Sequence, residues 1–242
     1  MASKYFRAKW EDPLEFVLNG QKLVTTSPPG SGSIVGGILR LLTKFSRMED
    51  FKDKSLNYHR FVEASKFAFA QRSKLGDWSD AEIADGVNAT INYLQSQDWL
   101  TWVMSKWSDQ KTFLTSQYYG AEYQYTDDHG TSHISILGPN GDAVSVTSTV
   151  NSYFGSGIMS KSSRIVLNNQ MDDFSTPNAA NTYGIAPSAE NFIKPLKRPV
   201  SSMAPSIVLD KNNRVKLVIG ASGGPRIITA VAYVRFKNQL RF

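Results

Sequence analysis

Two short runs of alternating side chains constrain the fold of this chain more than any other feature. They cover residues 131–136 and 143–151 and flank Gly138-Pro139-Asn140-Gly141-Asp142. Because successive side chains of a strand point to opposite faces, each run sorts by parity. Odd positions carry mostly polar side chains, and even positions carry mostly aliphatic ones. The pattern predicts a β-hairpin with one polar face and one apolar face.

The same parity limits how the two strands can pair. A two-residue turn at Asn140-Gly141 would pair residues whose numbers sum to an odd value, and Thr131 would then face Val150. That register mixes polar with apolar side chains. An even sum keeps the faces separate and needs an odd-length loop or a bulge. We therefore expect Thr131 to lie beside Thr149 or Asn151.

Thr131 is the first candidate for chemistry. It follows a glycine at the start of a strand and is flanked by other hydroxyl side chains, which marks a place where chemistry could happen. Exposed threonine-rich hairpins are also common, because β-branched residues suit pleated strands. The hairpin pattern alone leaves both interpretations open.

Composition narrows the class of protein. The chain has 242 residues, 41% hydrophobic and 20% charged, which suits one large globular domain or two small ones. It has no cysteine, which excludes disulfides and thiolate metal sites. The net charge of +6 comes from scattered Lys and Arg among acidic residues, which favours a solvated surface over a nucleic-acid partner. His59, His129 and His133 lack the spacing of metal ligands, so we expect no metal.

The first residues show no apolar segment typical of a signal peptide, and no run reaches the length of a membrane span. From the residues alone, we therefore expect no signal or anchor in this chain.

Apolar spacing and turn residues give a coarse map of the rest of the chain. Three-to-four spacing and capping residues predict helices over 10–16, 34–42, 57–75 with Asn57 as cap, 78–82, 90–107, and after Gly223-Gly224-Pro225. Alternation predicts strands over 21–26, 164–167, 206–210 and 215–219. Residues 127–130 should form an exposed loop and 153–157 a turn, and 175–204 should carry little regular structure.

Five motifs in fixed order carry a resemblance to a known family. They are Gly130-Thr131-Ser132-His133, Thr147-Ser148-Thr149-Val150-Asn151 with Phe154-Gly155-Ser156, Asn168-Asn169-Gln170-Met171-Asp172-Asp173-Phe174, Lys197-Arg198-Pro199-Val200-Ser201-Ser202-Met203, and Gly220-Ala221-Ser222-Gly223-Gly224. In this order the sequence resembles γ-glutamyltranspeptidase (glutathione hydrolase). Residues 13–130 also resemble the end of that family's large subunit, including Pro28-Pro29-Gly30-Ser31-Gly32. The resemblance covers nearly the whole chain, to about residue 233.

The resemblance implies an α+β fold, the four-layer αββα sandwich of the N-terminal-nucleophile hydrolases, incomplete at both ends. It implies a precursor that cuts itself between Gly130 and Thr131. Residues 1–130 would be the carboxyl-terminal part of a large-subunit-like region, and 131–242 a truncated, catalytic small-subunit-like region. The two self-cleaved subunits would stay associated, without a cofactor or metal, outside the cell or at the plasma-membrane surface.

The resemblance also implies an activity and assigns residues to it. The family hydrolyses glutathione and other γ-glutamyl amides or transfers the γ-glutamyl group to an amino acid or dipeptide, with water as the other acceptor. Thr131 would be the nucleophile, Thr149 would support it, and the N–H groups of Gly223 and Gly224 would hold the oxyanion. For the substrate, Asn151, Gln170 and Asp173 would line the site for the α-ammonium, and Ser201 and Ser202 would contact the α-carboxylate.

Some features depart from the family. Gln170 stands where the family usually has Glu, which removes one negative charge from the ammonium site. The amino half of the large subunit, with the family's carboxylate-binding arginine, has no counterpart here, and residues 235–242 stop before the family's remaining strands. These departures favour an alternative, a catalytically inactive paralogue that acts as a binding or interaction protein.

Overall fold

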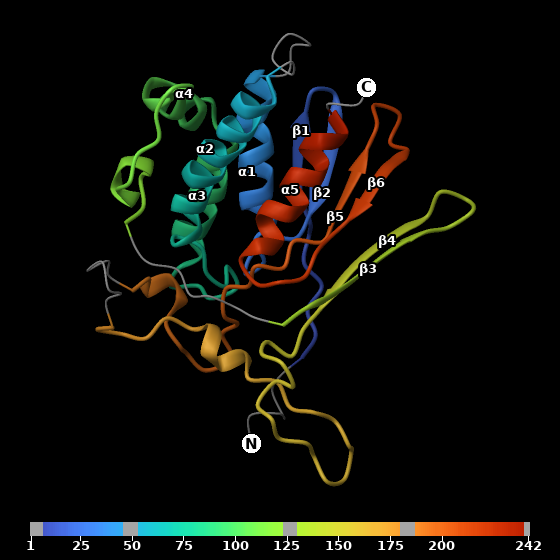
Figure 1. Cartoon of the computed structure of the whole chain (residues 1–242). Coiled ribbons are helices and arrows are strands. Elements are labelled where there is room, and N and C mark those ends of the chain that lie inside the picture. The colour runs from blue at the N-terminus through green and yellow to red at the C-terminus, as the bar shows by residue number, and fades with distance from the viewer. Residues whose placement is uncertain (1–6, 46–52, 123–129, 180–186, 240–242) are drawn as a thin grey trace.

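The computed structural model describes residues 7–45, 53–122, 130–179 and 187–239 (Figure 1). Helices lie beside two antiparallel sheets, which makes the fold a mixed α and β arrangement. None of the helices in these ranges has the length and apolarity that crossing a bilayer demands.

The larger sheet has four strands in the order β1-β2-β5-β6, and all neighbours are antiparallel. Its strands are β1 (Leu14–Leu18), β2 (Gln21–Thr25), β5 (Ser206–Leu209) and β6 (Val215–Ile219). The predictions for β2, β5 and β6 are confirmed. The central pairing joins β2 to β5, so the middle of the sheet unites residues from opposite ends of the chain.

The predicted helix over residues 10–16 is wrong, because Leu14–Leu18 forms β1 instead. Asn19 and Gly20 have φ angles of 50° and 76° and connect β1 to β2 as a two-residue turn. Two positive φ angles give the turn a twist that matches the paired strands. Phe16 and Leu18 alternate with exposed residues and are buried, as expected for a strand.

Three helices, α1 (Gly32–Leu42), α2 (Lys54–Arg72) and α5 (Arg226–Gln239), pack together beside this sheet (Figure 1). Gly36 and Gly37 let α1 pack closely against its neighbours. A Cβ at Gly36 would lie 2.4 Å from the Phe16 ring, and one at Gly37 would lie 3.2 Å from Leu94. The prediction of a helix after Gly223-Gly224-Pro225 is confirmed by α5.

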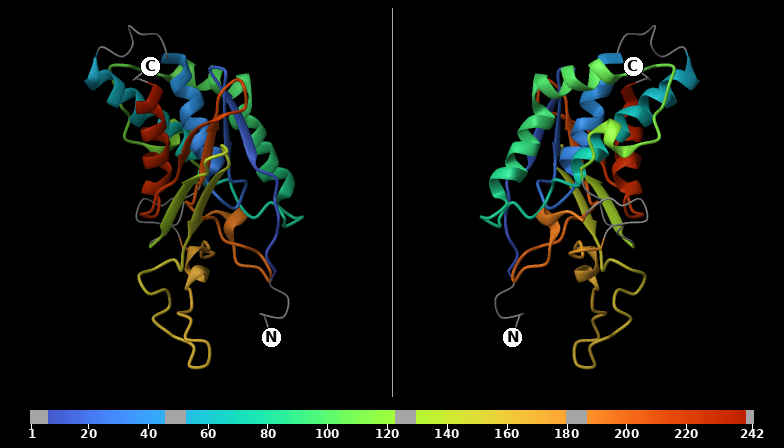
Figure 2. Two further views of the ribbon diagram at one scale, coloured as in Figure 1. Left: turned by 90° about the vertical axis from the view of Figure 1, so that its right-hand side faces the viewer. Right: turned by 90° about the vertical axis from the view of Figure 1, so that its left-hand side faces the viewer.

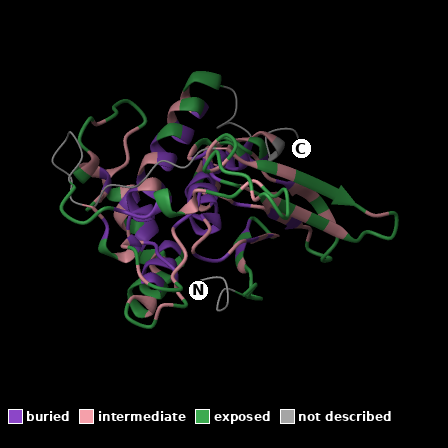
Figure 3. Ribbon diagram, turned by 90° about the horizontal axis from the view of Figure 1, so that it is seen from below, coloured by how far each residue is buried: buried purple, intermediate pink, exposed green. Residues whose placement is uncertain are grey.

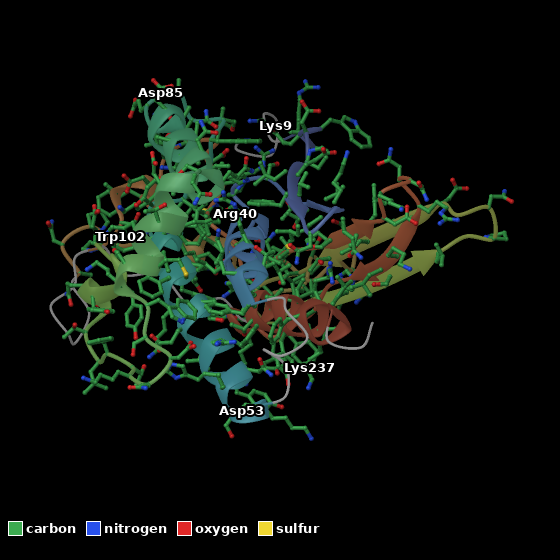
Figure 4. The ribbon with its side chains drawn as sticks, turned by 90° about the horizontal axis from the view of Figure 1, so that it is seen from above. Lys9, Arg40, Asp53, Asp85, Trp102 and Lys237 are labelled. Carbon is green, nitrogen blue, oxygen red and sulfur yellow. The ribbon has the colours of Figure 1, made fainter. Side chains whose placement is uncertain are left out.

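The helix predicted over 34–42 is confirmed by α1, whereas the remaining helix predictions need correction. The N-cap of α2 is Asp53 (Figure 4), whose Oδ1 accepts from Leu56 N at 3.1 Å, and Asn57 lies inside the helix. The helix over 90–107 is two helices, α3 (Ala84–Gln95) and α4 (Gln97–Lys106), because Ser96 leaves the helical conformation and caps α4. Arg40 fixes this break by donating to the carbonyls of Leu94 and Ser96 at 3.0 and 2.6 Å (Figure 4).

Residues 78–82 form turns, and the short helix predicted there is wrong. Asp77 Oδ1 accepts from Ser79 N at 3.1 Å, and Asp80 Oδ1 accepts from Glu82 N at 3.3 Å. Such short side-chain acceptors compete with helical hydrogen bonds.

The second sheet is the predicted hairpin, with β3 (Ser132–Leu137) paired to β4 (Ala143–Ser148). Ser132 faces Ser148, and this register extended by one residue sets Thr131 opposite Thr149, one of the two partners predicted. The loop over 138–142 has an odd length and is closed by a bond from Gly138 N to Asp142 O of 2.7 Å. The parity argument is therefore confirmed.

The hairpin turns its polar face to the protein. The Ser145 hydroxyl donates to Ile219 O at 3.0 Å and accepts from Ser206 N at 3.1 Å, so it joins the hairpin to a facing residue pair of β5 and β6. Ile134, Ile136, Val144 and Val146 on the other face are all exposed (Figure 3). We call these four residues the apolar hairpin face.

Residues after the hairpin leave the two sheets as an irregular excursion (Figures 1 and 2). The turn predicted at 153–157 is confirmed, but 164–167 forms no strand, only an isolated bridge between Met159 and Val166. Short 3-10 helices at Gln170–Asp173 and Ala189–Asn191 are the regular elements in the described part of 168–204. Residues 127–129 of the predicted exposed loop lie outside the described ranges.

Candidate active site

Gly130 occupies a position that only glycine suits. Its φ is 58°, and a Cβ there would lie 2.3 Å from the carbonyl oxygen of Asn151. A side chain would therefore be strained in its backbone and would collide with the neighbouring chain. Because of this close contact, the Gly130–Thr131 peptide bond lies next to the segment that follows β4.

Thr149 acts directly on that peptide bond. Its Oγ1 donates a hydrogen bond to the carbonyl oxygen of Gly130 and accepts from Asn151 N at 2.8 Å. Because the backbone amide takes a lone pair of the hydroxyl, the hydroxyl proton is directed at the carbonyl. A hydrogen-bond donor on this oxygen draws electrons from the carbonyl carbon of Gly130, which is bonded to the Thr131 nitrogen.

Asn151, Gln170 and Asp173 form a second group next to the first. Asn151 is buried with a φ of 72°, and its Nδ2 donates to Asn169 O at 3.3 Å. Gln170 Nε2 donates to Asp173 Oδ2 at 2.9 Å, and the Asp173 side chain is fully buried. The 3-10 turn at Gln170–Asp173 holds amide and carboxylate side by side.

Asn191 connects this group to the two serines. Its Nδ2 donates to the backbone oxygen of Asp173 at 2.7 Å, and its Oδ1 accepts from Val200 N at 2.9 Å. Asn191 is itself buried. Through it, the segment that carries Asp173 and the segment that carries Ser201 are fixed to each other.

Ser201 and Ser202 lie beside the turn that precedes α1. Ser201 N donates to Pro29 O at 2.9 Å, Ser31 Oγ donates to Ser201 O at 2.7 Å, and Ser31 N donates to Met203 O at 3.0 Å. Ser31, Ser201 and Ser202 are all buried. The motif Pro28–Gly32 thus provides a fixed support for both serines.

Sequence reasoning missed Arg72 at this position. Arg72 is 2% exposed, and its Nη2 donates to Ser202 Oγ at 2.8 Å. Its Nε donates to Ser31 Oγ at 3.4 Å. A sequence signal for a buried guanidinium here was the position of Arg72 one helical turn after the apolar Ala68 in the predicted helix over 57–75.

Gly223 and Gly224 form the turn that leads into α5. Their φ angles are 113° and 60°, and the Ile227 N to Gly224 O bond of 2.9 Å begins the helical pattern. Amide groups at a helix start lack intrahelical acceptors and can face an anion. This local geometry fits an oxyanion-binding turn.

His133 joins the hairpin to the strand that precedes this turn. Its Nδ1 lies 2.8 Å from Thr147 Oγ1 and its Nε2 lies 3.0 Å from Ser135 Oγ. A Cβ on Gly220 would lie 2.1 Å from the imidazole, so the ring fills the place of that missing side chain. Burial lowers the pKa of His133 below its ordinary value.

The predicted site residues therefore fall into two connected parts. One hydrogen-bond system includes Gly130, Thr149, Asn151, Gln170, Asp173, Ser201 and Ser202. The second part is the glycine pair, Gly223 and Gly224. The segment that leads to this pair packs against the hairpin, where His133 contacts Gly220. Direct contact between Thr131 and the glycine pair stays a prediction.

Comparison with known proteins gives the same family along the whole chain. The family described as "Gamma-glutamyltranspeptidase" matches residues 3–239. The chain is 46% identical over 214 residues to Scoloptoxin SSD14 of Scolopendra dehaani, which covers 87% of this chain and 36% of that protein. It is 40% identical over 232 residues to Glutathione hydrolase 2 of Arabidopsis thaliana, which covers 95% of this chain and 39% of that protein.

A solved structure agrees on the fold. The cephalosporin acylase of Bacillus halodurans superposes with a TM-score of 0.72 at 21% identity, over 97% of this chain and 38% of its own. The chain spans little more than a third of the length of these relatives. The match over residues 3–239, together with the five motifs and their connected geometry, shows that the chain belongs to the gamma-glutamyltranspeptidase family.

Proposed function

We propose that this chain carries the self-cleaving and catalytic part of a γ-glutamyl hydrolase or transferase whose nucleophile is Thr131. The observation that carries the proposal is the hydrogen bond from Thr149 Oγ1 to the carbonyl oxygen of Gly130. It activates the one peptide bond whose cleavage would leave Thr131 as a chain terminus.

Self-cleavage follows from this contact. The Thr131 hydroxyl oxygen adds to the Gly130 carbonyl carbon. The C–N bond then breaks, and the proton of the hydroxyl moves to the Thr131 nitrogen. Thr149 stabilises the negative charge on the carbonyl oxygen during the addition. Water then hydrolyses the resulting ester, which yields a Gly130 carboxylate and a Thr131 with a free amine and a free hydroxyl.

The free amine makes the new terminus a catalyst. An α-amine has a pKa of about 8, so it can accept the proton of its own hydroxyl near neutral pH. The Thr131 oxygen then attacks the γ-glutamyl carbonyl and the leaving amine takes the proton. Water or an acceptor amine displaces the acyl group, and the N–H groups of Gly223 and Gly224 hold the oxyanion.

The connected side chains suit an amino-acid end on the substrate. Asp173 and Gln170, with Asn151, would receive the α-ammonium, and Ser201 and Ser202 would donate to the α-carboxylate. The Asn191 bridge supports this assignment because it fixes the two groups at one distance. Glutathione and other γ-glutamyl amides are the proposed substrates, with water, amino acids or dipeptides as acceptors.

The two products would remain together after cleavage. Residues 1–130 would become the large-subunit-like part and 131–242 the small-subunit-like part. Support comes from β2 and β5, which pair across this boundary from Lys22 with Leu209 to Thr25 with Ser206. In the complete protein we propose the four-layer αββα sandwich, with a further layer over the apolar hairpin face, and a location outside the cell or at its surface.

The test is mass spectrometry of the purified chain over time, combined with release of a chromophore from a γ-glutamyl anilide. Wild type should split between Gly130 and Thr131 and then turn over. Thr131→Ala should do neither. Thr149→Val removes the donor at nearly constant volume and should slow cleavage by about 10²-fold or more, while Thr149→Ser should keep it.

Uncut wild-type protein without turnover would overturn the proposal and favour a binding role for the chain. A 45% identical relative over 64% of the chain is described as "Putative inactive glutathione hydrolase 4" of Arabidopsis thaliana. Cleavage of Thr149→Val at the wild-type rate would remove Thr149 from the mechanism.

A further inference from the structure

A buried guanidinium lies directly behind the serine proposed to bind the substrate carboxylate. Arg72 is the last residue of α2, and its Nη2 donates to Ser202 Oγ at 2.8 Å. Both side chains are almost completely buried. The contact joins residues 130 positions apart, so it exists only in the folded protein.

This contact determines what the hydroxyl can do. A hydroxyl oxygen that accepts a bond from a guanidinium must direct its own proton elsewhere. A hydrogen bond from a charged donor is stronger than a neutral one, and it polarises the oxygen that receives it. The polarised O–H of Ser202 is therefore a better donor to an anion, and the positive charge behind it favours an anion over a neutral group.

The guanidinium is held in place from a second side. Its Nε donates to Ser31 Oγ at 3.4 Å, and the same hydroxyl donates to Ser201 O at 2.7 Å. The turn that carries Ser31 is compact, because a Cβ on Gly32 would lie 2.3 Å from Thr26 O. Ser31 thus fixes the arginine and the two-serine segment relative to each other.

We propose that Arg72 is a positioning residue for the α-carboxylate of the γ-glutamyl group, acting through Ser202 and held by Ser31. The proposal deepens the proposed function and rests on it for the identity of the anion. It assigns to the end of α2 the selection of a carboxylate over a neutral group at this position of the ligand.

Two ligands isolate the effect. L-Glutamate carries the α-carboxylate, and L-isoglutamine carries an amide in its place, with the remaining groups unchanged. Binding of each is measured by calorimetry, which requires neither self-cleavage nor turnover. Arg72→Gln should weaken glutamate binding about tenfold, the size of one charge-assisted hydrogen bond, and should change isoglutamine binding less than about twofold.

Two further variants separate positioning from folding. Arg72→Lys keeps the charge and should retain most of the preference for glutamate. Arg60→Gln is the matched control, because Arg60 is a second buried arginine of α2 whose Nη2 pairs with Asp109 at 2.7 Å, away from the serines. It should cost stability without changing the preference. For turnover, Arg72→Gln should raise KM for a γ-glutamyl anilide more than it lowers kcat.

Each result decides the matter. Equal weakening of both ligands in Arg72→Gln, or an unchanged preference, would overturn the role of Arg72. Wild type that binds glutamate but never turns over would overturn the proposed catalysis and leave this inference standing. Wild type that binds neither ligand would overturn the carboxylate site and the role of Arg72 together.

Discussion

His133 is an imidazole held between two sheets by uncharged partners. Its ring nitrogens contact the hydroxyls of Thr147 and Ser135, and the ring lies against Gly220. Burial lowers its pKa, since removal from water penalises the charged ring. The folded protein therefore favours the neutral ring.

The lowered pKa predicts a pH dependence of stability. Above pH 6.5, the ordinary pKa of histidine, both states are neutral at this site and its contribution is fully present. As the pH falls below that value, the unfolded chain binds a proton that the folded chain resists, so the free energy of unfolding decreases until the folded pKa is reached.

Urea unfolding at pH 7.5 and about pH 5.5 measures this effect. His133→Gln keeps hydrogen-bonding groups but cannot titrate, so wild type should lose more stability over the interval than the variant. Equal losses in the two proteins would show that other groups cause the pH dependence.

At the scale of elements, the contact between the hairpin and the end of β6 depends on one missing side chain. Gly220→Ala would place a methyl group 2.1 Å from the His133 ring, which must then shift. We expect a loss of about 1–3 kcal/mol in the free energy of unfolding, as for other overpacked sites. Thermal and urea unfolding measure it.

A double variant tests the cause of that loss. Removing the ring in His133→Ala should make Gly220→Ala much less costly, because the methyl group then has space. Gly86→Ala is the control, since nothing lies within 4 Å of its Cβ position in α3, and it should be neutral or stabilising. If the two losses simply add, the steric explanation is wrong.

The sequence predicted those elements whose side-chain alternation or turn residues lie within a short stretch of the chain. Parity limited β3 and β4 to registers with an even sum, because a shift of one residue would reverse both faces, and it left two partners for Thr131 open. The error at β1 was avoidable, since Asn19-Gly20 is a strong hairpin signal that the proline at position 13 obscured. The break at Ser96 was hard to predict, because the apolar pattern runs through it. Its only signal in the sequence is a serine that can cap the helix that follows.

The contacts that build the candidate site were beyond local patterns. The resemblance named most residues of the site but not Arg72 or Asn191, and it gave none of the connections between them. Arg72 meets Ser202 and Ser31, and His133 meets Gly220, across long stretches of sequence. No periodicity encodes such meetings, because they depend on how the sheets and helices pack.

At the scale of the whole molecule, the apolar hairpin face is a departure from a water-compatible surface. Ile134 and Ile136 are 60% and 52% exposed, and Val144 and Val146 lie beside them on the neighbouring strand. A contiguous apolar patch of this kind favours association. We expect the purified chain to self-associate in solution through this face.

Sedimentation velocity over a range of concentrations tests the expectation. Ile134→Thr with Val146→Thr replaces a directly facing pair and keeps residues that suit strands, so it should reduce association without unfolding the hairpin. Val17→Thr is the control, an equally β-branched and exposed residue on β1. Association that both changes affect equally would place the contact elsewhere.

The pairing of β2 with β5 sets an order of events during synthesis. Residues 21–25 leave the ribosome well before their partners at 206–209 are translated. Until then β2 has no β5 to pair with, and the hairpin that begins at residues 130–131 lacks its contacts with β5 and β6. Any maturation that depends on the closed sheet therefore begins only when translation has passed residue 209, so a nascent chain stalled before that point should remain uncut.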